Sequence, residues 1–562
     1  MITPSDKPKH LLTILVEDYF HVGAFENLIH QRNWANFEPR YEQNTHKALD
    51  ILDEFDTKAT FFVLGWIAEQ NPNLIREIAR RGHEVASRGY YHRSVSHLTD
   101  QEFREDLRRT NDVISSATGQ TVAGYRAAEK LDLKNDLWVF DVLADEGFVY
   151  DASFMPNRGS SGERRFAHQV AAAGRMIWEF PYSTRDLGLG LMPISGGNYF
   201  RQIPYTLMRH AVKAWTNETD APFVSYFHVW ELDPDQPRIN AANKYNRIRH
   251  YRKLDKMEWI LRENLAAYDC MSVARHLGIE AAPGEHPVEN NAKEPAAAAA
   301  IVSDRHGLTP VTIGIPCYNE TEALPYLANT LRSVQQTLAD TGYDANFIFV
   351  DDKSTDNTLE TLNELFADWT NVTVLSHETN KGVAAGIMTA IRSAETEIVA
   401  SMDCDCTYDP HELARMLPML GDDVDMVTAS PYHRDGGVRN VPGWRLFLSK
   451  GASFLYRRVL NAKLDTYTSC FRVYRRSSVI GQDLTENGFL GVAELLGRLD
   501  LEGGKIVEFP AILEVRLFGF SKMKTARTIV GHLKLISRLI NLRWFRNSDA
   551  IEPSIPLEEK SR

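Results

Sequence analysis

Short apolar runs alternate with helix-like patterns in the first half of the chain. The run "KATFFVLG" precedes "NPNLIREIARRG", where Asn71 is placed to cap a helix, Pro72 to begin it and Gly82 to end it. "HEVAS" then starts another apolar run. This rhythm predicts parallel strands joined by helices. Because "MIWEFP" and "FVSYFHVW" extend it over about 280 residues, we expect an α/β fold closed into a (β/α) barrel.

The second half repeats this rhythm with a different set of apolar runs. They read "VTIGIPCYN", "YDANFIFVDD", "VTVLSHE" and "EIVASMDCD", and helix patterns separate them. They predict an open, doubly wound sheet whose ligand lies beyond the carboxyl ends of the strands. Four acidic residues stand at such ends, namely Asp351, Asp352, Asp403 and Asp405.

The stretch between the halves, residues 281–308, is rich in Ala, Pro, Glu and Asn and shows no apolar period. This composition is typical of a solvated tether. We therefore expect a first domain over 1–280, a linker over 281–308, a second domain over 309–525 and a basic helix with a tail over 526–562.

Composition restricts the class of protein. Among the 562 residues, 43% are hydrophobic and 25% are charged, as in a soluble globular protein, and the net charge of −12 argues against nucleic-acid binding. The five cysteines form no CxxC pair, and no apolar run is long enough to span a bilayer, so we expect a cytoplasmic protein. In "KMKTARTIVGHLKLISRLINLRWFR" apolar and basic residues alternate at helical spacing, which indicates either peripheral membrane contact or a helix packed on its own domain.

Several motifs between residues 10 and 280 resemble the NodB-like polysaccharide deacetylase family, in its exopolysaccharide-locus branch. They include "LTILVEDYFHV", "GHEVASRGYYHR", "GYRAAE" and "YFHVWELDPDQPRI", in family order. The resemblance implies a distorted (β/α) barrel of NodB type. It also implies a divalent metal held by a carboxylate and two histidines, an aspartate base that activates water, and a histidine that assists the leaving amine.

This sequence departs from that pattern at decisive positions. Leu15 stands where the resemblance implies the base, and Arg88 stands where it implies the first histidine ligand. A guanidinium stays protonated and cannot donate a lone pair to a metal. The retained family positions are Glu17 or Asp18 as the carboxylate, His92, Arg126 and His228. We expect an inactive domain without zinc; the alternative is that Glu17 or Asp18, His92 and His97 still bind a metal.

Motifs from about 310 to 525 resemble family 2 glycosyltransferases, in the branch of the dolichyl-phosphate and polyprenyl-phosphate sugar synthases. They read "PCYNE", "VDDKSTDNT", "NKGVAAG", "MDCDCTYDP", "TSCFRVYRR" and "RLFGFSKMK". The resemblance implies a GT-A (Rossmann-like) domain that binds a nucleotide sugar. The residues it implies for that donor are Pro316, Tyr318, Asn319, Glu320, Asp351, Asp352 and Lys381. As alternatives, Pro316 and Tyr318 could be loop packing and Asp351 a helix cap.

The pair Asp403 and Asp405 carries the expected chemistry. Two residues apart in an extended chain, their carboxylates point to one side and can share Mg²⁺ or Mn²⁺, which takes up charge on a leaving diphosphate. A lipid phosphate acceptor needs only cations, whereas a sugar hydroxyl needs a carboxylate base. Glu494 is the candidate base, although an ion-paired role suits it equally. The candidates for binding an acceptor phosphate are Arg472, Arg516, Ser521 and Lys522.

These patterns predict an inverting glycosyltransferase that moves a sugar to a lipid-phosphate or glycan acceptor in surface polysaccharide or glycolipid synthesis. Two alternatives stay open. One is a bifunctional enzyme with an active metal-dependent N-deacetylase, and the other is a scaffold that binds glycans without catalysis.

Overall fold

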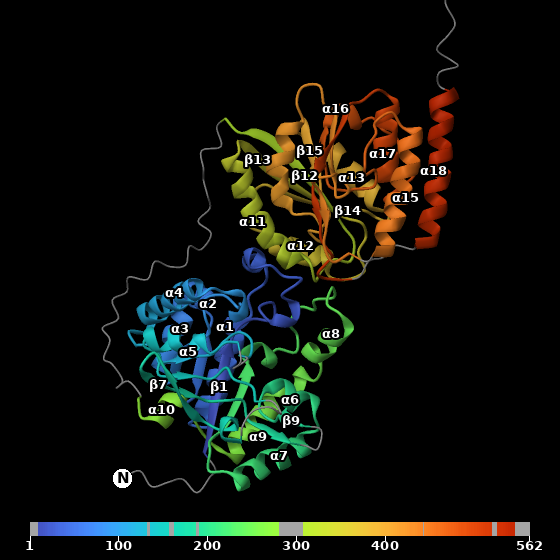
Figure 1. The fold of residues 1–562 in the computed structure, drawn as a ribbon. Helices are drawn as coiled ribbons and strands as arrows, with labels where there is room; N and C mark the ends of the chain where they lie inside the picture. Colours follow the sequence, from blue (N-terminus) through green and yellow to red (C-terminus); the bar gives the residue numbers. More distant parts are fainter. Residues whose placement is uncertain are drawn as a thin grey trace, which may run out of the picture. The chain divides into compact units, whose positions relative to one another are not determined.

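The computed structural model describes residues 9–131, 135–156, 162–186, 190–279, 307–441, 443–519 and 525–545. The chain forms two compact units (Figure 1). The first contains most residues up to Ile301, and the second runs from Val302 and also includes Ala35–Glu38 and Pro237–Ala241. Most of the predicted linker, and the predicted tail beyond residue 545, lie outside the described residues.

The first unit is built on a nine-stranded sheet with the strand order β10-β1-β2-β3-β4-β5-β7-β6, and β11 pairs additionally with β1. All of these pairings are parallel except that of β6 with β7. The strands are β1 (Lys9–Val16), β2 (Thr60–Val63), β3 (Glu84–Ser87), β4 (Gly124–Tyr125), β5 (Tyr150–Asp151), β6 (His168–Ala172), β7 (Arg175–Glu179), β10 (Phe223–His228) and β11 (Asp269–Met271). A separate ribbon pairs β8 (Thr184–Asp186) with β9 (Leu191–Pro193).

The predicted α/β class and parallel strands are confirmed, but a closed barrel is not shown. Within the described ranges, β10 and β6 are the ends of the sheet and do not pair with each other. β4 and β5 contribute only two residues each, and the sheet then ends in the antiparallel hairpin β6–β7. A chain that turns back on itself at that edge presents no parallel strand to close the ring.

Helices cover this sheet. They are α1 (Tyr41–Glu54), α2 (Gly65–Gln70), α3 (Pro72–Arg80), α4 (Asp100–Thr118), α5 (Trp138–Asp145), α6 (Gly197–Gln202), α7 (Tyr205–Glu218), α8 (Lys244–Tyr251), α9 (Met257–Ala267) and α10 (Val273–Leu277). α3 begins as predicted, because the Asn71 side chain accepts a hydrogen bond from the amide of Leu74 at 3.1 Å. Its apolar face, Leu74, Ile75 and Ile78, is buried.

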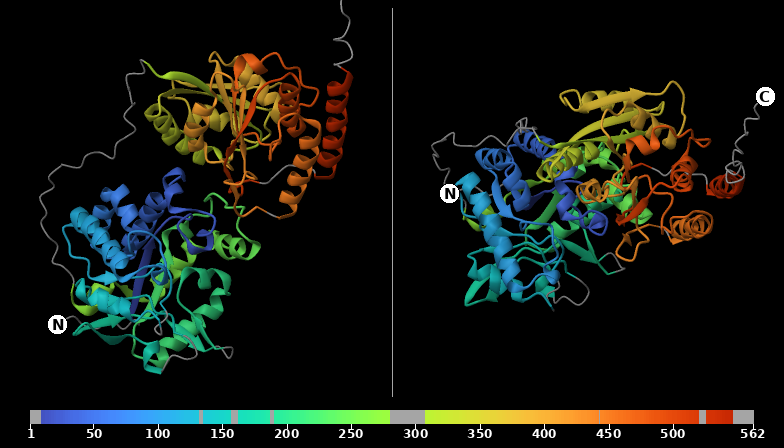
Figure 2. Two further views of the ribbon diagram at one scale, coloured as in Figure 1. Left: turned by 45° about the horizontal axis from the view of Figure 1, so that its top comes forward. Right: turned by 90° about the horizontal axis from the view of Figure 1, so that it is seen from above.

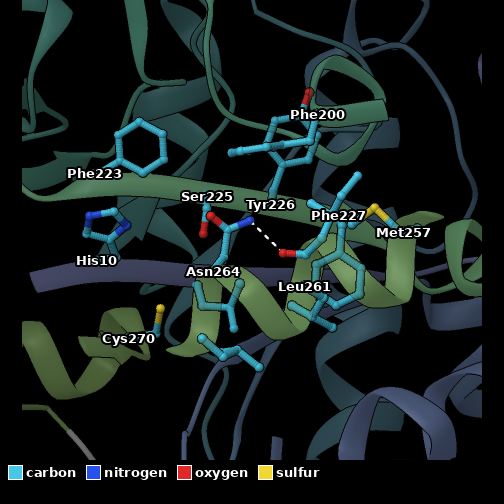
Figure 3. Close-up of a pocket in the computed structure, with 13 residues that line it drawn as sticks. His10, Phe200, Phe223, Ser225, Tyr226, Phe227, Met257, Leu261, Asn264 and Cys270 are labelled. Atoms are coloured by element: carbon cyan, nitrogen blue, oxygen red, sulfur yellow. Dashed lines mark hydrogen bonds between the residues drawn. The ribbon is translucent and has the colours of Figure 1, made fainter. Parts of the chain in front are cut away.

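A small cavity lies between β10 and α9 (Figure 3). Its volume is about 30 Å³, and its lining is mostly apolar, with Phe223, Phe227 and Leu261 among the side chains. His10 is the buried polar exception, and its Nε2 has no hydrogen-bond partner among the described residues. Such a volume holds a water molecule or two and not a sugar, so this cavity is a packing feature of the first unit.

The second unit is built on a seven-stranded sheet with the strand order β14-β13-β12-β15-β18-β16-β19. β18 is antiparallel to both of its neighbours, and the other pairings are parallel. The strands are β12 (Thr309–Cys317), β13 (Tyr343–Asp351), β14 (Val372–Ser376), β15 (Ile398–Ser401), β16 (Met426–Ser430), β18 (Arg472–Arg475) and β19 (Ile506–Pro510), and a separate ribbon pairs β17 (Gly437–Val438) with β20 (Ile512–Leu513). The open, doubly wound sheet predicted from the sequence is confirmed.

Helices pack on both faces of this second sheet. They are α11 (Leu324–Asp340), α12 (Thr358–Leu365), α13 (Val383–Ser393), α14 (Leu413–Met416), α15 (Gly443–Val459), α16 (Arg476–Val479), α17 (Phe489–Leu501) and α18 (Thr525–Phe545). Successive side chains of a strand point to opposite faces of the sheet, and each face has its own apolar core. Ile313 of β12 packs in the core with α11, and Val350 of β13 packs in the core with α13. Figure 2 shows the red helix α18 beside the orange helix α15 in both views.

In both sheets the strand order reverses beside the first strand of the unit. β1 pairs with β2 on one side and β10 on the other, and β12 pairs with β13 on one side and β15 on the other. A crevice forms beyond the carboxyl ends of the strands at such a point, and ligands of α/β proteins bind there. The fold therefore marks one candidate site in each unit.

Replacing Asn71 by Ala should lower the free energy of unfolding of the first unit by about 1 kcal/mol, because the helix then loses its capping acceptor. Urea denaturation followed by circular dichroism measures this change. Asn73→Ala is the matched control, since Asn73 is exposed on the same helix and bonds only the neighbouring Arg76 in the described contacts. Equal losses in the two variants would contradict the capping role.

Candidate functional site

The first site gathers four polar side chains where β1, β3 and β10 end. Glu17 follows β1, Arg88 follows β3 and His228 is the last residue of β10. Arg88 Nε donates to Glu17 Oε2 at 2.7 Å, and His228 Nδ1 contacts Glu17 Oε1. His92 Nε2 lies 3.6 Å from Glu17 Oε2. Glu17 is therefore the centre of the cluster, and a guanidinium is its nearest cation.

Arg88 is held on several sides. Its Nη1 donates to the carbonyl of Ala127 at 3.0 Å and its Nη2 to that of Ala128 at 3.4 Å, and only 3% of its side chain is exposed. Burial alone would raise the pKa of Glu17, but the charge of Arg88 and the contact with His228 hold it well below its usual value. Burial lowers the pKa of His92 to about 4, so this imidazole is neutral at pH 7. The carboxylate is thus ionised and paired.

Asp18, the other candidate carboxylate, turns away from this cluster. Its Oδ1 accepts from its neighbour Tyr19, and its Oδ2 accepts from the amides of Arg40 and Tyr41 at 2.6 and 2.8 Å. Burial raises the pKa of Asp18 to about 7. Its role in the structure is to organise the start of α1, which leaves Glu17 as the acid of the site.

The remaining positions of the first site have contacts of their own. Leu15 is buried in the apolar core beside Phe62. Arg126 donates to Thr13 Oγ1 at 2.9 Å and lies over the rings of Tyr182 and Tyr226. His97, the alternative ligand, is exposed in a short 3₁₀ turn. No group of three or more His, Cys, Asp or Glu side chains in the described ranges has an arrangement that could hold a metal ion.

Sequence analysis missed a buried acid pair in the same sheet. Asp151 ends β5 and Glu179 ends β7, and these residues are direct partners in the strand pairing. Asp151 accepts from the Ser153 hydroxyl at 2.6 Å, and Glu179 accepts from the amide of Phe154 at 3.1 Å. Burial raises the pKa of both groups, and the neighbouring charge of Asp151 raises the pKa of Glu179 further. The only signal for this pair in the sequence is an acid at the end of each run.

The second site gathers acidic residues where β12, β13 and β15 end. Glu320 follows β12, Asp351 ends β13, and Asp403 and Asp405 follow β15. Burial and the neighbouring charge of Asp405 raise the pKa of Asp403 to about 7. The structure thus brings together acids that lie far apart in sequence, as their positions at the strand ends predict.

Arg516 lies among these acids. Its Nε donates to Asp405 Oδ2 at 2.5 Å, and its Nη1 donates to Glu320 Oε1 at 3.1 Å. The guanidinium of Arg516 thus bridges Glu320 of the "PCYNE" motif and Asp405 of the "MDCDCTYDP" motif. Ser521 and Lys522, the other basic or polar acceptor candidates of this segment, lie outside the described residues.

Asp351 and Asp352 are occupied by neighbouring loops. Asp351 accepts from the amide of Ser354 and the hydroxyl of Ser376, both at 3.2 Å. Asp352 accepts from the amides of Lys381 and Gly382 at 2.7 and 2.6 Å and from His377 Nδ1 at 2.8 Å. His377, which sequence analysis missed, therefore helps Asp352 to shape the "NKG" loop.

The loop after β12 is held in a similar way. Asn319 receives a hydrogen bond from the amide of Thr355 at 2.7 Å and adopts a positive φ of 54°. Pro316 and Tyr318 are half-buried beside it, and the side chain of Lys381 is exposed. These residues stay candidates for nucleotide contact because they lie beyond the strand ends where the order of the sheet reverses.

Two candidates have positions that do not suit the roles expected of them. Arg472 is fully buried and donates to the Thr428 hydroxyl and to the carbonyls of Val492 and Tyr467, so it stabilises the sheet and is not open to an acceptor. Glu494 is also buried.

The carboxylate of Glu494 accepts from the amides of Thr485 and Glu486 and from Arg498 Nε at 2.8 Å. It therefore anchors a turn, and the ion-paired alternative suits its position better than a role as base.

Helix α18 packs on its own domain through one set of side chains and exposes other apolar side chains. Leu535 and Leu539 are buried against the domain, while Leu533 is exposed and Trp544 is 71% exposed. α15, which contacts α18, adds Phe447 at 79% exposure. No helix in the described part of the chain is both long and apolar enough to cross a bilayer.

Comparison with known protein families gives three matches. Residues 312–481 match "Glycosyl transferase family 2", residues 30–135 match "Polysaccharide deacetylase", and residues 152–277 match "Domain of unknown function (DUF3473)".

Curated relatives match each half separately. A dolichol-phosphate mannosyltransferase of Pyrococcus furiosus is 30% identical over 243 residues, which are 43% of this chain and 66% of that protein. A polyprenol monophosphomannose synthase of Mycolicibacterium smegmatis is 31% identical over 217 residues, 37% of this chain and 79% of that protein. In the first half, a peptidoglycan-N-acetylglucosamine deacetylase of Bacillus cereus is 35% identical over 93 residues, 16% of this chain and 34% of that protein.

Replacing Glu179 by Gln should make stability less sensitive to alkaline pH. Burial raises the pKa of Asp151 and Glu179 above their ordinary values of 3.8 and 4.5. The stabilisation they provide is therefore complete below those values and is lost as pH rises through the raised pKa values. An amide cannot ionise, so the variant should lose less stability between about pH 5 and about pH 9 in urea denaturation.

Glu42→Gln on α1 is the control for the acid pair, because Glu42 is exposed and should leave the pH dependence of the wild type unchanged. An identical pH dependence of stability in the Glu179 variant and the wild type would show that the acid pair does not cause that dependence.

Proposed function

Because this chain belongs to glycosyl transferase family 2 through its second half, we propose that it transfers a sugar from a nucleotide-sugar donor to a polyprenyl-phosphate acceptor. The observation that carries the proposal is the acid pair Asp403 and Asp405 beyond β15, at the point where the strand order of the sheet reverses. The names of the two mannosyl-transferring relatives given above refer to dolichol phosphate and to polyprenol. This shared lipid class supports the acceptor.

The acid pair fits a divalent cation. Carboxylate oxygens are the ligands that Mg²⁺ and Mn²⁺ prefer, and Mg²⁺ sites in phosphoryl chemistry use one or two carboxylates together with substrate phosphates and water. Asp403 and Asp405 would hold the ion, which would neutralise negative charge on the departing diphosphate. The raised pKa of Asp403 supports this fit, since it reflects a partly buried acid beside another acid.

Residues of the chain itself would position the donor. Asp352 draws the amides of Lys381 and Gly382 toward the end of β13, which holds the "NKG" loop at the crevice. Pro316, Tyr318 and Asn319 follow from β12 on the same border. We assign these residues to the nucleotide because they surround the crevice without belonging to the acid pair.

The contacts of the candidate base favour a phosphate over a sugar hydroxyl as the acceptor. A phosphate oxygen is already anionic and can displace the diphosphate directly, with inversion at the anomeric carbon and without a general base. Glu494, the candidate base, is engaged by a turn and by Arg498. A lipid phosphate therefore suits this site better than a sugar hydroxyl, with Arg516, Ser521 and Lys522 as its assigned cationic and polar partners.

Helices α15 and α18 provide a surface for such a lipid. Phe447, Phe454, Leu533 and Trp544 are exposed apolar residues of these helices, and Lys534 is an exposed cation among them. Apolar side chains enter the interfacial region of a bilayer, and each nearby cation adds about 1 kcal/mol of attraction to anionic lipids. We assign the protein to peripheral contact with the cytoplasmic face of a membrane in surface polysaccharide or glycolipid synthesis.

The first half would be catalytically silent. The guanidinium of Arg88 pairs with Glu17 where a metal would need that carboxylate, and Leu15 cannot act as a base. The competing function is a bifunctional enzyme that removes acetyl groups as well.

Replacing Asp405 by Asn should reduce sugar transfer at least about 100-fold, because one of two cation ligands is lost. The assay follows nucleoside diphosphate release from UDP- and GDP-sugars in the presence of polyprenyl phosphate and MnCl₂. Asp423→Asn is the control, since Asp423 is an exposed acid that pairs with Lys505. Undiminished transfer by the Asp405 variant would remove the metal-assisted proposal.

Replacing Arg88 by His should create zinc binding in the first unit, because the new imidazole would join His92 and Glu17. Isothermal titration with ZnCl₂ measures it, and Arg88→Gln is the control that removes the charge without adding a ligand. Tight zinc binding together with acetate release from chitin oligosaccharides by the wild type would establish the bifunctional alternative instead.

A further inference from the structure

Arg516 lies in the acid cluster of the second unit, on the carboxylates that a metal ion would need. Its guanidinium donates to both Asp405 and Glu320. Both oxygens of Asp405 are engaged, because its Oδ1 accepts from the amide of Thr407 at 3.1 Å and its Oδ2 accepts from Arg516. A divalent ion at Asp405 would meet a like charge at hydrogen-bonding distance from its ligand.

The backbone around Arg516 is held independently of this ion pair. The amide of Glu514 donates to the carbonyl of Thr407 at 2.9 Å. On the other side, Phe518 is buried against Tyr326 of α11, with ring centroids 5.8 Å apart. The guanidinium can therefore leave the acids through rotation of its own side chain while the main chain stays in place.

Comparison with Arg88 shows that the ion pair of Arg516 is suited to exchange. Arg88 is 3% exposed and also donates to two main-chain carbonyls, so removing it would strand buried acceptors. The side chain of Arg516 is 25% exposed, and in the part of the chain that the structure describes its acceptors are carboxylates alone. Solvent can reach it, and an incoming cation can take over both of its partners.

We propose that Arg516 is an internal counter-ion of the acid cluster, which gives way to the divalent cation when the donor binds and is then free to contact a phosphate group. This inference rests on the proposed function, because it assigns a sequence of events to the same site. Donor and cation bind first, since only their arrival releases Arg516. The anionic acceptor binds second, to the released guanidinium.

The test measures binding of MnCl₂ alone to the full-length protein, by electron paramagnetic resonance of free Mn²⁺. Arg516→Gln should bind Mn²⁺ about tenfold more tightly than the wild type, because the internal competitor is gone. Arg516→Lys should fall between the two, since an ammonium keeps the charge but loses the forked geometry. Arg415→Gln is the matched control, an exposed arginine of the same unit that pairs with Glu412, and should match the wild type.

A second measurement adds UDP or GDP to the same titration. In the wild type the nucleotide and Mn²⁺ should strengthen each other's binding, because together they displace the guanidinium. This mutual effect should be smaller in Arg516→Gln, where Mn²⁺ has no internal competitor to displace. Thermal unfolding of each variant confirms that it is folded.

Equal or weaker Mn²⁺ binding by Arg516→Gln, in a folded protein, would overturn the inference and leave the proposed function standing if Asp405→Asn still abolishes Mn²⁺ binding. Retention of Mn²⁺ binding by Asp405→Asn would instead contradict the metal site itself. The two failures are therefore distinguishable.

Discussion

The pairing of a buried carboxylate with a cation at the end of a parallel strand is the interaction on which both halves depend. An ionised acid away from water is costly unless a cation or several donors compensate it. Glu17 lies at the reversal of strand order between β1 and β10, and Asp405 lies at the corresponding reversal between β12 and β15. Each acid is compensated by an arginine. What distinguishes the halves is how firmly that arginine is held.

Much of the fold could be predicted because its signals are local. The start of α3 depends on Asn71 and Pro72 within a few residues, and the apolar runs of both sheets are continuous in sequence. The open end of the first sheet could not be predicted, because it depends on how β6 turns back on β7 rather than on any run. The hydrophobic pattern of a strand indicates that the strand belongs to a sheet. It does not indicate which strands pair to close that sheet into a barrel.

The candidate site shows the same division. The position of Asp403 and Asp405 after a strand was predictable from the apolar run before them. The extended conformation expected for the pair is wrong, because β15 ends at Ser401 and Asp405 lies in a turn. Their partner was not predictable: Arg516 is 111 positions from Asp405, and no spacing rule relates them. The choice between Glu17 and Asp18 likewise depended on the amides of Arg40 and Tyr41, which only the tertiary structure brings to Asp18. Arg472 and Glu494 carry the right charges for catalysis but lie among buried main-chain partners.

A single physical difference separates the arginine of the first site from that of the second. An arginine that satisfies buried carbonyls as well as a carboxylate becomes part of the packing, because its removal leaves several acceptors unpaired. Arg88 is such a residue, so the site of the first half is compensated without a metal. An arginine that is itself partly exposed and whose partners are carboxylates alone can be exchanged for another cation without that loss. Arg516 is in this position, and the acids around it stay available to a cation that arrives with a substrate.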